Sequence, residues 1–399
     1  MNIGTIITII DLLLWLIIAA NVAYVLFFAL ASLLPKKSIH HSPFTIHQSN
    51  YLILFPAYHE DAVILHSIES FLQQDYPKDR YHVVVISDHM SPETNEQLSK
   101  LPITLLQPTF EHSSKAKALQ YAIHSPVTLH HSPYDFVVIL DADNIVQSDF
   151  LIQLNKIATP DQAVQCHRTA KNADNDIAAL DGISEEINNN IFRKGHNRIG
   201  MSSALIGSGM CFDYQWFAKN VNHLDSAVED RELEALLMKQ GIYIHYAEDI
   251  HVLDEKVSNS DTFQRQRLRW MSGQVQALIR MLPYIPKAII TGNINYIDKT
   301  IQQALIPRSI LLVITPFLTL VSLFAFYILP LPSYIIPLKW LILLILLVAA
   351  ILIAIPAPLR TEALFGKLIT LPRLVWRMLT NLININPSNK EFIHTTHQP

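Results

Sequence analysis

The sequence predicts an α/β domain with a mixed, mostly parallel sheet, placed between apolar segments that span a membrane. Half of the residues (50%) are hydrophobic and only 16% are charged. The apolar residues gather at the two ends of the chain, while the charges gather in the middle. In that middle part, short runs rich in valine and isoleucine, typical of buried strands, alternate with segments of helical spacing. The net charge of −4 gives no reason to expect a nucleic-acid partner.

A first membrane helix is predicted near the amino terminus. From Ile3 to Leu34 the apolar sequence is interrupted only by Asp11 and Asn21, and about 20 apolar residues span a bilayer core. Lys36 and Lys37 follow at once, whereas no Lys or Arg precedes the stretch. The positive-inside rule then predicts an amino terminus outside and a main domain in the cytosol. A cleaved signal peptide is the alternative, but it would have a basic start and a shorter apolar run.

The main domain is predicted to contain three short strands, each closed by polar residues. The strands are Tyr51–Phe55, His82–Ile86 and Phe136–Leu140, and helical spacing is found at Ala62–Gln74 and Lys115–His124. Segments of this pattern predict a sheet of mostly parallel strands that is covered by helices. Because open α/β sheets bind ligands at the carboxyl ends of their strands, we expect the functional site there.

Two more membrane helices are predicted from about Ser309 to Leu329 and from about Ile335 to Ile355. The linker between them, Pro330–Ser333, is long enough only for a tight hairpin. The hairpin returns the carboxyl terminus to the cytosol, where the positive-inside rule places the basic residues of the tail. The mixed segments 274–305 and 364–382 are predicted to lie in the plane of the membrane interface. Ordinary packed helices are the alternative for both.

Cysteine and histidine give no sign of a metal site of their own. Cys166 and Cys211 are the only cysteines, and their spacing is not that of a metal motif. Two cysteines could pair, but reduced thiols in a cytosolic domain are the simpler interpretation. The 18 histidines form no compact ligand set along the sequence.

The clearest chemical signal is Asp141-Ala142-Asp143, directly after the third apolar strand. Two carboxylates one residue apart at a strand end can meet a divalent cation and a diphosphate. Mg²⁺ takes one or two protein carboxylates and completes its shell with phosphate oxygens and water. Because Asp-x-Asp alone is also common among solvated turn residues, the interpretation depends on the motifs around it.

Further motifs follow one another in a characteristic order. They are Phe55-Pro56-Ala57-Tyr58-His59-Glu60-Asp61, Ser87-Asp88, Lys115-Ala116-Lys117, Gly207-Ser208-Gly209, Glu229-Asp230 and Gln266-Arg267-Leu268-Arg269-Trp270. This combination resembles the membrane-bound family 2 glycosyltransferases, which include cellulose, chitin and hyaluronan synthases and bacterial poly-N-acetylglucosamine synthases. The resemblance covers about residues 51–273. It implies a domain of the GT-A (nucleotide-diphospho-sugar transferase) fold, a UDP-sugar donor, and Mg²⁺ or Mn²⁺ as cofactor.

The resemblance also implies a role for each matching residue. Asp230 would be the general base, and Asp143 would bind the metal. The donor side would be formed by Pro56, Ala57, Glu60, Asp88, Lys115, Asp141, Gln266 and Arg269. The acceptor side would be formed by Trp270, Gly209 and Glu229.

Elementary chemistry supports these roles. A metal ion and a guanidinium offset the negative charge of the leaving UDP. A positioned carboxylate helps an alcohol to attack, typically by 10²–10⁴-fold. An indole face suits the apolar side of a pyranose. A single in-line displacement would invert the anomeric carbon and give a β-linked product from an α-linked donor.

The sequence departs from the family pattern in the donor pocket. The family often has Asn where His59 stands, a paired Asp where Ser87 stands, and Asn where Gln120 stands. Lys115 is the better match to the family lysine, although Lys117 could serve instead. Outside these positions, Arg265 and Arg267 fit surface charge near lipid headgroups as well as they fit contact with phosphate.

The predicted organisation has five parts. They are an N-terminal membrane helix (1–35), a cytosolic GT-A domain (48–273), an interfacial segment (274–307), a membrane hairpin (308–356) and a cytosolic amphipathic tail (357–399). The predicted activity is transfer to a growing polysaccharide, and a second membrane subunit or self-association could complete a channel. Transfer of one sugar to a lipid, as in ceramide glucosyltransferases, is the alternative. A scaffold with an inactive site is a third option, against which the intact motifs argue.

Overall fold

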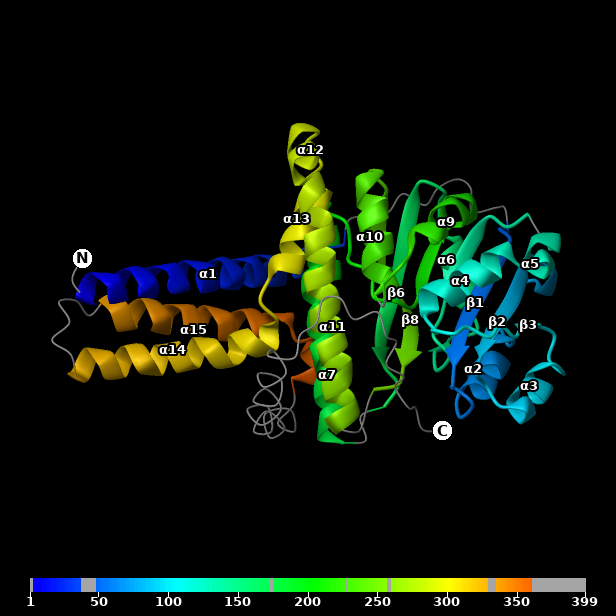
Figure 1. Ribbon diagram of the computed structural model, residues 1–399, viewed down its shortest axis with the longest axis horizontal. Helices are drawn as coiled ribbons and strands as arrows, with labels where there is room; N and C mark the ends of the chain where they lie inside the picture. Colours follow the sequence, from blue (N-terminus) through cyan, green and yellow to red (C-terminus); the bar gives the residue numbers. More distant parts are fainter. Residues whose placement is uncertain are drawn as a thin grey trace.

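The computed structural model describes residues 3–36, 48–131, 133–172, 175–226, 228–256, 260–328 and 335–360 (Figure 1). Within these ranges the side chains of 3, 4, 260–265, 328, 335 and 336 are not described. Predictions on Lys37, on the linker Pro330–Ser333 and on most of the amphipathic tail therefore lie outside the described residues.

A mixed sheet forms the centre of the main domain, as the sequence predicts. Its strands are β1 (Tyr51–Tyr58), β2 (Tyr81–Asp88), β3 (Thr104–Leu106), β4 (Phe136–Ile139), β5 (Ile145–Val146), β6 (Gln162–Ala170), β7 (Met210–Asp213) and β8 (Tyr243–Asp254). They are arranged in the order β3-β2-β1-β4-β7-β6-β8-β5. The pairs β1–β2, β1–β4, β2–β3 and β6–β8 are parallel, and the three pairs with β7 or β5 are antiparallel.

Alternate residues of the central strands feed two separate hydrophobic cores. In β1, Leu52 and Leu54 pack on one face, with α4 (Lys115–His124), α9 (Tyr214–Asn220) and α10 (Glu229–Lys239). Ile53 and Phe55 pack on the other face, with α2 (Ile64–Phe71), α3 (Pro92–Leu98) and α6 (Phe150–Asn155). The short elements η2 (Lys78–Arg80), α5 (Pro126–His130) and η4 (Val221–His223) connect these layers. Burial on both faces explains why the strands are apolar runs and not alternating ones.

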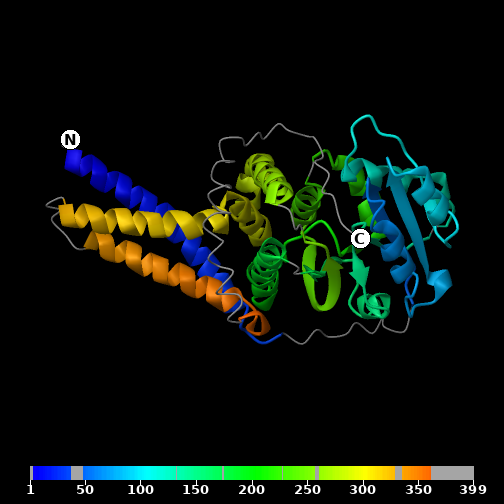
Figure 2. The same ribbon diagram turned by 90° about the horizontal axis from the view of Figure 1, so that it is seen from below.

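In the part of the chain that the structure describes, three helices are long and apolar enough to cross a membrane, namely α1 (Ile3–Ala31), α14 (Arg308–Ile328) and α15 (Ile335–Ala354). They lie side by side and extend away from the sheet domain (Figures 1 and 2). The two polar residues of α1 both have partners: Asp11 pairs with Lys339 and accepts from Trp340 Nε1 at 2.8 Å, and Asn21 Oδ1 accepts from Ile306 N at 2.8 Å. A short turn, η6 (Ala357–Leu359), follows α15.

Helices fill the space between the apolar bundle and the sheet (Figure 1). They are α7 (Asp176–Asn188), the π-helix η3 (Asn189–Gly195), α8 (His196–Arg198), α11 (Ser260–Met281), η5 (Leu282–Tyr284), α12 (Ile285–Ile290) and α13 (Ile294–Ala304). α11 continues without a break through the predicted boundary at 273/274. Ile290 at the end of α12 and Ile294 at the start of α13 are 86% and 66% exposed, so large apolar side chains remain on the surface there.

Helix α1 packs closely on η3 and α8. A Cβ atom at Gly195 would overlap the carbonyl oxygen of Phe28, so only glycine permits this approach. The Phe28 ring stacks on His196, with centroids 3.5 Å apart and planes at 4°. Tyr24 Oη donates to Asp298 Oδ1 at 2.6 Å. These contacts join the first apolar helix to the central helices, and we refer to them as the membrane junction.

Candidate active site

The carboxyl ends of β1, β2 and β4 meet at one edge of the sheet. The register pairs Ala57 with Ser87 and Tyr58 with Asp88, and Asp141 follows the end of β4, which pairs with β1. Parallel pairing therefore brings the predicted donor residues of three strands together. Pro56, one position earlier in β1, lies at the same edge.

Two histidines follow β1 and β2 in the left-handed backbone region. His59 has φ 54° and His89 has φ 55°, and their rings lie 5.7 Å apart. Asn and His are among the side chains that tolerate this region best, which explains why His59 can stand where the family often has Asn. His89 Nδ1 lies 2.6 Å from Asp88 Oδ1, so the buried Asp88 carboxylate already has an imidazole partner.

The other departures from the family pattern are structural. Ser87 Oγ donates to Asn95 Oδ1 at 2.5 Å. Gln120 Nε2 donates to the carbonyl oxygens of Val221 and Leu224 at 3.1 and 2.9 Å. Gln120 therefore fastens α4 to a neighbouring turn. Glu60 lies in the loop after β1, where its backbone N–H meets Met90 Sδ at 3.1 Å.

Lys115 is the lysine that faces the site. Its Nζ pairs with Asp141, donates to the carbonyl oxygen of Gly207 at 2.7 Å, and lies 3.4 Å from Glu229 Oε1. Lys117 instead points to the surface and donates to the carbonyl oxygen of His112 at 2.6 Å. The first residue of α4, rather than the third, therefore reaches the end of β4.

Gly207 lies at the centre of the charged cluster. A Cβ atom there would be 3.9 Å from each of Asp230 Oδ2, Glu229 Oε1 and Lys115 Nζ, and the residue has φ +78°. Gly209, two residues later, is buried, and its Cβ would be 2.9 Å from Val252 Cγ2. The sequence analysis singled out Gly209, but Gly207 is the glycine that borders the functional side chains.

The charges of this cluster act strongly on one another. Burial would lower the pKa of Lys115, but Asp141 and Glu229 outweigh it and raise the pKa. Burial raises the pKa of Glu229, which Lys115 opposes and Asp230 reinforces. Burial lowers the pKa of Arg269, against the charges of Glu229, Asp230 and Asp141. Arg269 thus lies in the field of the same carboxylates, and the predicted base, lysine and arginine come from α10, α4 and α11.

Asp143 is buried and fixed by two donors. Its Oδ2 accepts from Glu255 N at 2.7 Å, and its Oδ1 accepts from Asn144 Nδ2 at 3.3 Å. Asn144 Oδ1 in turn accepts from Asp141 N at 2.9 Å, so one amide side chain orients both acids of the motif. Within the described ranges no group of three or more His, Cys, Asp or Glu side chains could hold a metal. The residues fit a hard cation that takes one or two carboxylates together with phosphate oxygens.

A buried ionic network, which no sequence motif indicates, supports the Asp-x-Asp loop. Arg168 Nε pairs with Glu185 at 2.7 Å, and Arg168 Nη1 lies 3.7 Å from Asp254 and 3.9 Å from Asp141. Lys256 pairs with both Glu185 and Asp254. Asp254 also accepts from Asn144 at 3.2 Å. The network therefore connects β6, α7 and the end of β8 to both acids.

One face of α11 carries the Gln-x-x-Arg-Trp motif. Counted from Gln266, the next three residues of this face follow after three, four and seven positions, which places them on the same side of the helix. They are Arg269, Trp270 and Gly273. A Cβ atom at Gly273 would overlap Val228 Cγ1 and lie 2.9 Å from Cγ2. Because Val228 directly precedes Glu229 and Asp230, Gly273 allows α11 to approach the start of α10. Gly273 is a positioning residue that the sequence analysis did not identify.

Trp270 is partly exposed and packs against an arginine of its own helix. Arg267 Cζ lies 4.7 Å from the centroid of the Trp270 ring, and Arg267 pairs with Asp181 of α7. Arg267 therefore contacts both the Trp270 ring and α7, and Trp270 directly follows Arg269.

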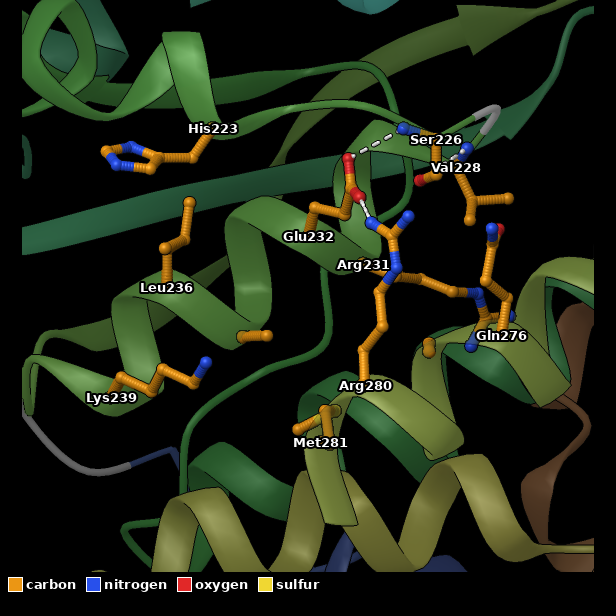
Figure 3. A pocket seen from close by; sticks show the side chains of 12 residues that line it. His223, Ser226, Val228, Arg231, Glu232, Leu236, Lys239, Gln276, Arg280 and Met281 are labelled. Atoms are coloured by element: carbon orange, nitrogen blue, oxygen red, sulfur yellow. Dashed lines mark hydrogen bonds and ion pairs between the residues drawn. The ribbon is translucent and has the colours of Figure 1, made fainter. Parts of the chain in front are cut away.

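A cavity of about 130 Å³ lies further along the cleft between α10 and α11 (Figure 3). Its walls include Val228 and Arg231 of the α10 side and Ala277 and Arg280 of α11, but not Asp230. Along α11, Gly273 and its contact with Val228 lie between Trp270 and the residues Ala277 and Arg280 that line the cavity. Lys115, Glu229 and Asp230 of the charged cluster around Gly207 are not among the residues that line the cavity.

The fold and the cluster at its strand ends define a nucleotide-sugar glycosyltransferase of the GT-A type. The model of the glycosyltransferase-like family 2 matches residues 47–273, more than half of the 399 residues. The chain belongs to this family. A search of curated proteins finds no match.

Solved structures agree with the fold. The mannosyltransferase PcManGT from Pyrobaculum calidifontis, in complex with GDP-Man and Mn²⁺, is 18% identical, with a TM-score of 0.54 over 92% of this chain and 94% of that chain. Glucosyl-3-phosphoglycerate synthase from Mycobacterium tuberculosis is 15% identical, with a TM-score of 0.40 over 59% and 83%. S. aureus TarS 1-349 with UDP-GlcNAc is 15% identical, with a TM-score of 0.36 over 84% and 90%. Only the first of these is close enough to support the fold.

Proposed function

We propose that this protein is a membrane-bound, inverting glycosyltransferase. It transfers a sugar from a UDP-sugar to a lipid acceptor at the cytosolic surface of the membrane. The convergence of Lys115, Asp141, Glu229, Asp230 and Arg269 around Gly207 carries the proposal. These charges come from four separate elements and meet next to a strand end, which is where a diphosphate and an attacking hydroxyl must come together.

On the donor side, Asp88, Pro56, Ala57 and Glu60 would shape the pocket for the base, with the His59 and His89 rings beside it. Lys115, Gln266 and Arg269 would face the diphosphate, whose charge increases as the bond to the sugar breaks. Asp143 and Asp141 would hold Mg²⁺ or Mn²⁺, which supplies further charge neutralisation when bound. A divalent cation agrees with the Mn²⁺ described for PcManGT.

On the acceptor side, Asp230 would take the proton from the attacking hydroxyl. Its carboxylate lies at the start of α10, and Glu229 beside it has a raised pKa. Glu229 Oε1 lies 3.4 Å from Lys115 Nζ, so the Glu229 carboxylate already has a cationic partner, and we assign the role of base to Asp230. Trp270 would stack on the acceptor sugar or on its carrier. Attack opposite the leaving UDP inverts the anomeric carbon.

The packing of the apolar helices favours a lipid acceptor over a growing polysaccharide. Side chains of α1, α14 and α15 fill the space between them, including Val22, Leu311 and Trp340, which are at most 1% exposed. A polysaccharide would need a passage made by a second subunit or by self-association. A lipid acceptor stays in the bilayer and needs only to bring its head to Trp270. Polysaccharide extension is therefore the second candidate.

The proposed topology has the amino terminus outside and the sheet domain in the cytosol, with the parts 1–35, 48–273, 274–307, 308–356 and 357–399 as predicted. It can be tested because both native thiols, Cys166 and Cys211, are free and buried and give little background. An impermeant maleimide added outside should label Asn2→Cys and not Lys390→Cys. Labelling of Lys390→Cys and not of Asn2→Cys would reject the topology. The sheet domain would then have no access to a UDP-sugar in the cytosol.

Product analysis tests the activity itself. The purified full chain is incubated in detergent with Mg²⁺ or Mn²⁺, a panel of UDP-sugars, and either a lipid extract or an oligosaccharide primer. We expect a β-linked monoglycosylated lipid, identified by mass spectrometry and by the anomeric proton coupling. A ladder of products on the oligosaccharide would favour polysaccharide extension, and turnover of no UDP-sugar would contradict the proposed donor.

A further inference from the structure

His89 directly follows β2 and bonds the carboxylate that ends this strand. Successive side chains of a strand point to opposite faces of the sheet, but His89 has φ 55°, in the left-handed region. Its ring meets the preceding side chain, and Nδ1 lies 2.6 Å from Asp88 Oδ1. Because an ionised carboxylate only accepts hydrogen bonds, the proton lies on Nδ1, which donates to Oδ1.

Asp88 keeps its second carboxylate oxygen for a ligand. Among the described residues the carboxylate has one partner, the His89 ring. The residue as a whole is 3% exposed, yet Oδ2 is not one of the solvent-sealed oxygens without a hydrogen bond that the described ranges contain. Oδ2 therefore retains contact with solvent at the end of the sheet, whereas Oδ1 is taken by the imidazole.

The loops after β1 and β2 fix the position of His89. Three contacts join the two loops. They are His59 N to the Asp88 carbonyl oxygen at 3.4 Å, Glu60 N to Met90 Sδ at 3.1 Å, and Ser91 N to Asp61 Oδ1 at 2.8 Å. Ser91 is also the N-cap of α3. His89 is thus held between the end of a strand and the start of a helix, and a group fixed in this way cannot easily move aside for a different ligand.

UDP and GDP differ only in the base, so a choice between them is made where the base lies. Guanine offers two neighbouring donors, the ring N1–H and the 2-amino group, which together suit both oxygens of one carboxylate. Uracil offers one ring donor, N3–H, between two carbonyl oxygens. A carboxylate with one oxygen already bonded therefore satisfies uracil and leaves one donor of guanine unpaired, which costs affinity.

We propose that His89 selects a uridine over a guanosine donor by keeping Oδ1 of Asp88 occupied. The proposal rests on the proposed function, in which Asp88 faces the base, and it adds the residue that decides which base is accepted. His89 acts through Asp88 and is therefore a positioning residue. The missing hydrogen bond to guanine should lower its affinity by about ten- to hundredfold.

Nucleotide binding tests the proposal without any turnover. The purified full chain in detergent is titrated in a calorimeter with UDP, GDP and inosine diphosphate, each in the presence of Mn²⁺. Inosine diphosphate is GDP without the 2-amino group, so a comparison of the two measures the second hydrogen bond directly. We expect the wild type to bind UDP about tenfold or more tightly than GDP, and to bind GDP and inosine diphosphate within about threefold of each other.

His89→Gly removes the imidazole, and glycine adopts the left-handed backbone without strain. This variant should bind GDP about ten- to hundredfold more tightly than inosine diphosphate. When Asp88→Asn is added, this gain should disappear, because an amide has only one oxygen. His59→Gly is the matched control, since His59 has φ 54° and a ring 5.7 Å from that of His89. It should keep the wild-type order of the three nucleotides.

Three results would overturn the proposal. They are a wild type that binds GDP tenfold more tightly than inosine diphosphate, a His89→Gly variant with the wild-type ratio, and a gain for GDP that persists with Asp88→Asn. Thermal melting identifies loss of fold, and if His89→Gly does not fold, the wild-type ratio of GDP to inosine diphosphate decides. A wild type that prefers GDP to UDP, or binds none of the three, contradicts the proposed donor as well. A preference for UDP that His89→Gly leaves unchanged rejects the role of His89 and not the proposed function.

Discussion

The charged cluster around Gly207 at the edge of the sheet and the polar contacts of the membrane junction differ in how their groups are paired. At the junction His196 is fully buried, and its ring nitrogens lie 2.8 Å from the Ile191 carbonyl oxygen and 3.0 Å from Tyr24 Oη. At the sheet edge the Asp141 side chain keeps 31% exposure, Lys115 Nζ lies 3.4 Å from Glu229 Oε1, and Arg269 lies in the field of the same carboxylates.

The two regions therefore have different physical roles. The junction pairs its polar groups with one another, which fixes how α1 sits on the central helices. The sheet edge holds like charges close together, an arrangement that costs stability and that a charged ligand can relieve. Changes at the sheet edge should therefore affect ligand and rate, whereas changes at the junction should affect stability.

The largest effect is expected at the acids of the sheet edge. Asp230→Asn should lower transfer by at least 10²-fold while UDP and metal still bind, because only the proton acceptor is lost. Asp143→Asn should weaken metal-dependent binding of UDP. Calorimetry with UDP and Mn²⁺ separates the two roles. Equal loss of UDP binding in both variants would show that the assignment of base and metal ligand is wrong.

A smaller effect is expected where α11 meets α10. Gly273→Ala should lower kcat by up to about 10²-fold, because displacement of Arg269 and Trp270 by about 1 Å misaligns the reacting groups. The overlapping atoms belong to Val228, so Val228→Ala in the same chain should restore most of the rate. Steady-state kinetics of the single and double variants measure this rescue.

Ser272→Ala, on the same helix turn, is the control and should keep the wild-type rate. A double variant as slow as Gly273→Ala alone would remove Gly273 from its positioning role.

Trp270→Ala tests the acceptor side and should cost about 1 kcal/mol or more of stacking. Transfer should fall by roughly tenfold or more, while slow hydrolysis of the UDP-sugar to water continues, since the donor groups are unchanged. Release of UDP without acceptor and thermal melting are the two measurements. A variant that melts much lower and loses hydrolysis as well would identify Trp270 as a packing residue that holds α11 to α7.

The smallest effect is expected at the junction and depends on pH. Burial lowers the pKa of His196, so the folded chain binds fewer protons there than the unfolded chain does. Stability should therefore fall as the pH drops below about 6.5, the ordinary value for histidine, and continue to fall toward the folded pKa. At pH 7.5 His196→Gln should have a lower melting temperature than the wild type. On going to pH 5 its melting temperature should fall by less than that of the wild type.

Other histidines share this window, so the comparison must be a difference between variants. Burial lowers the pKa of His82 and of His245 to about 4 as well. Melting curves at pH 5, 6 and 7.5 for the wild type and His196→Gln give the difference. If the melting temperatures of the two proteins fall equally with pH, protonation of His196 does not contribute to the pH dependence of stability.

Much of the fold was predictable because local patterns encode it. The apolar runs at 51–55, 82–86 and 136–140 became β1, β2 and β4, and the helix predicted at Lys115–His124 has the observed bounds. The sequence analysis did not anticipate that Pro56 lies inside β1 or that α11 crosses the boundary at 273/274. A helix can continue through a change of composition, since its hydrogen bonds are made by the backbone alone.

The site was predictable only in part. Asp141, Asp143, Glu229 and Asp230 stand in recognisable motifs, and the structure brings Asp141, Glu229 and Asp230 close to Lys115. The choice of Lys115 over Lys117 and of Gly207 over Gly209 needed the structure. In each pair both residues have the same type and nearly the same neighbours in sequence, and only the direction of the element decides which one faces the site.

The strand ends, the acids that follow them and the three apolar helices could be read from local sequence, because each of these depends on residues that are close along the chain. Only the tertiary structure decided that Arg168 and Asp254 support the Asp-x-Asp loop, that Gly273 meets Val228, and that Arg308 reaches Asn188 of α7. Such contacts join residues dozens of positions apart with no shared periodicity. They exist because packed helices and strands bring distant side chains within hydrogen-bonding distance, and this depends on the shape of the whole core.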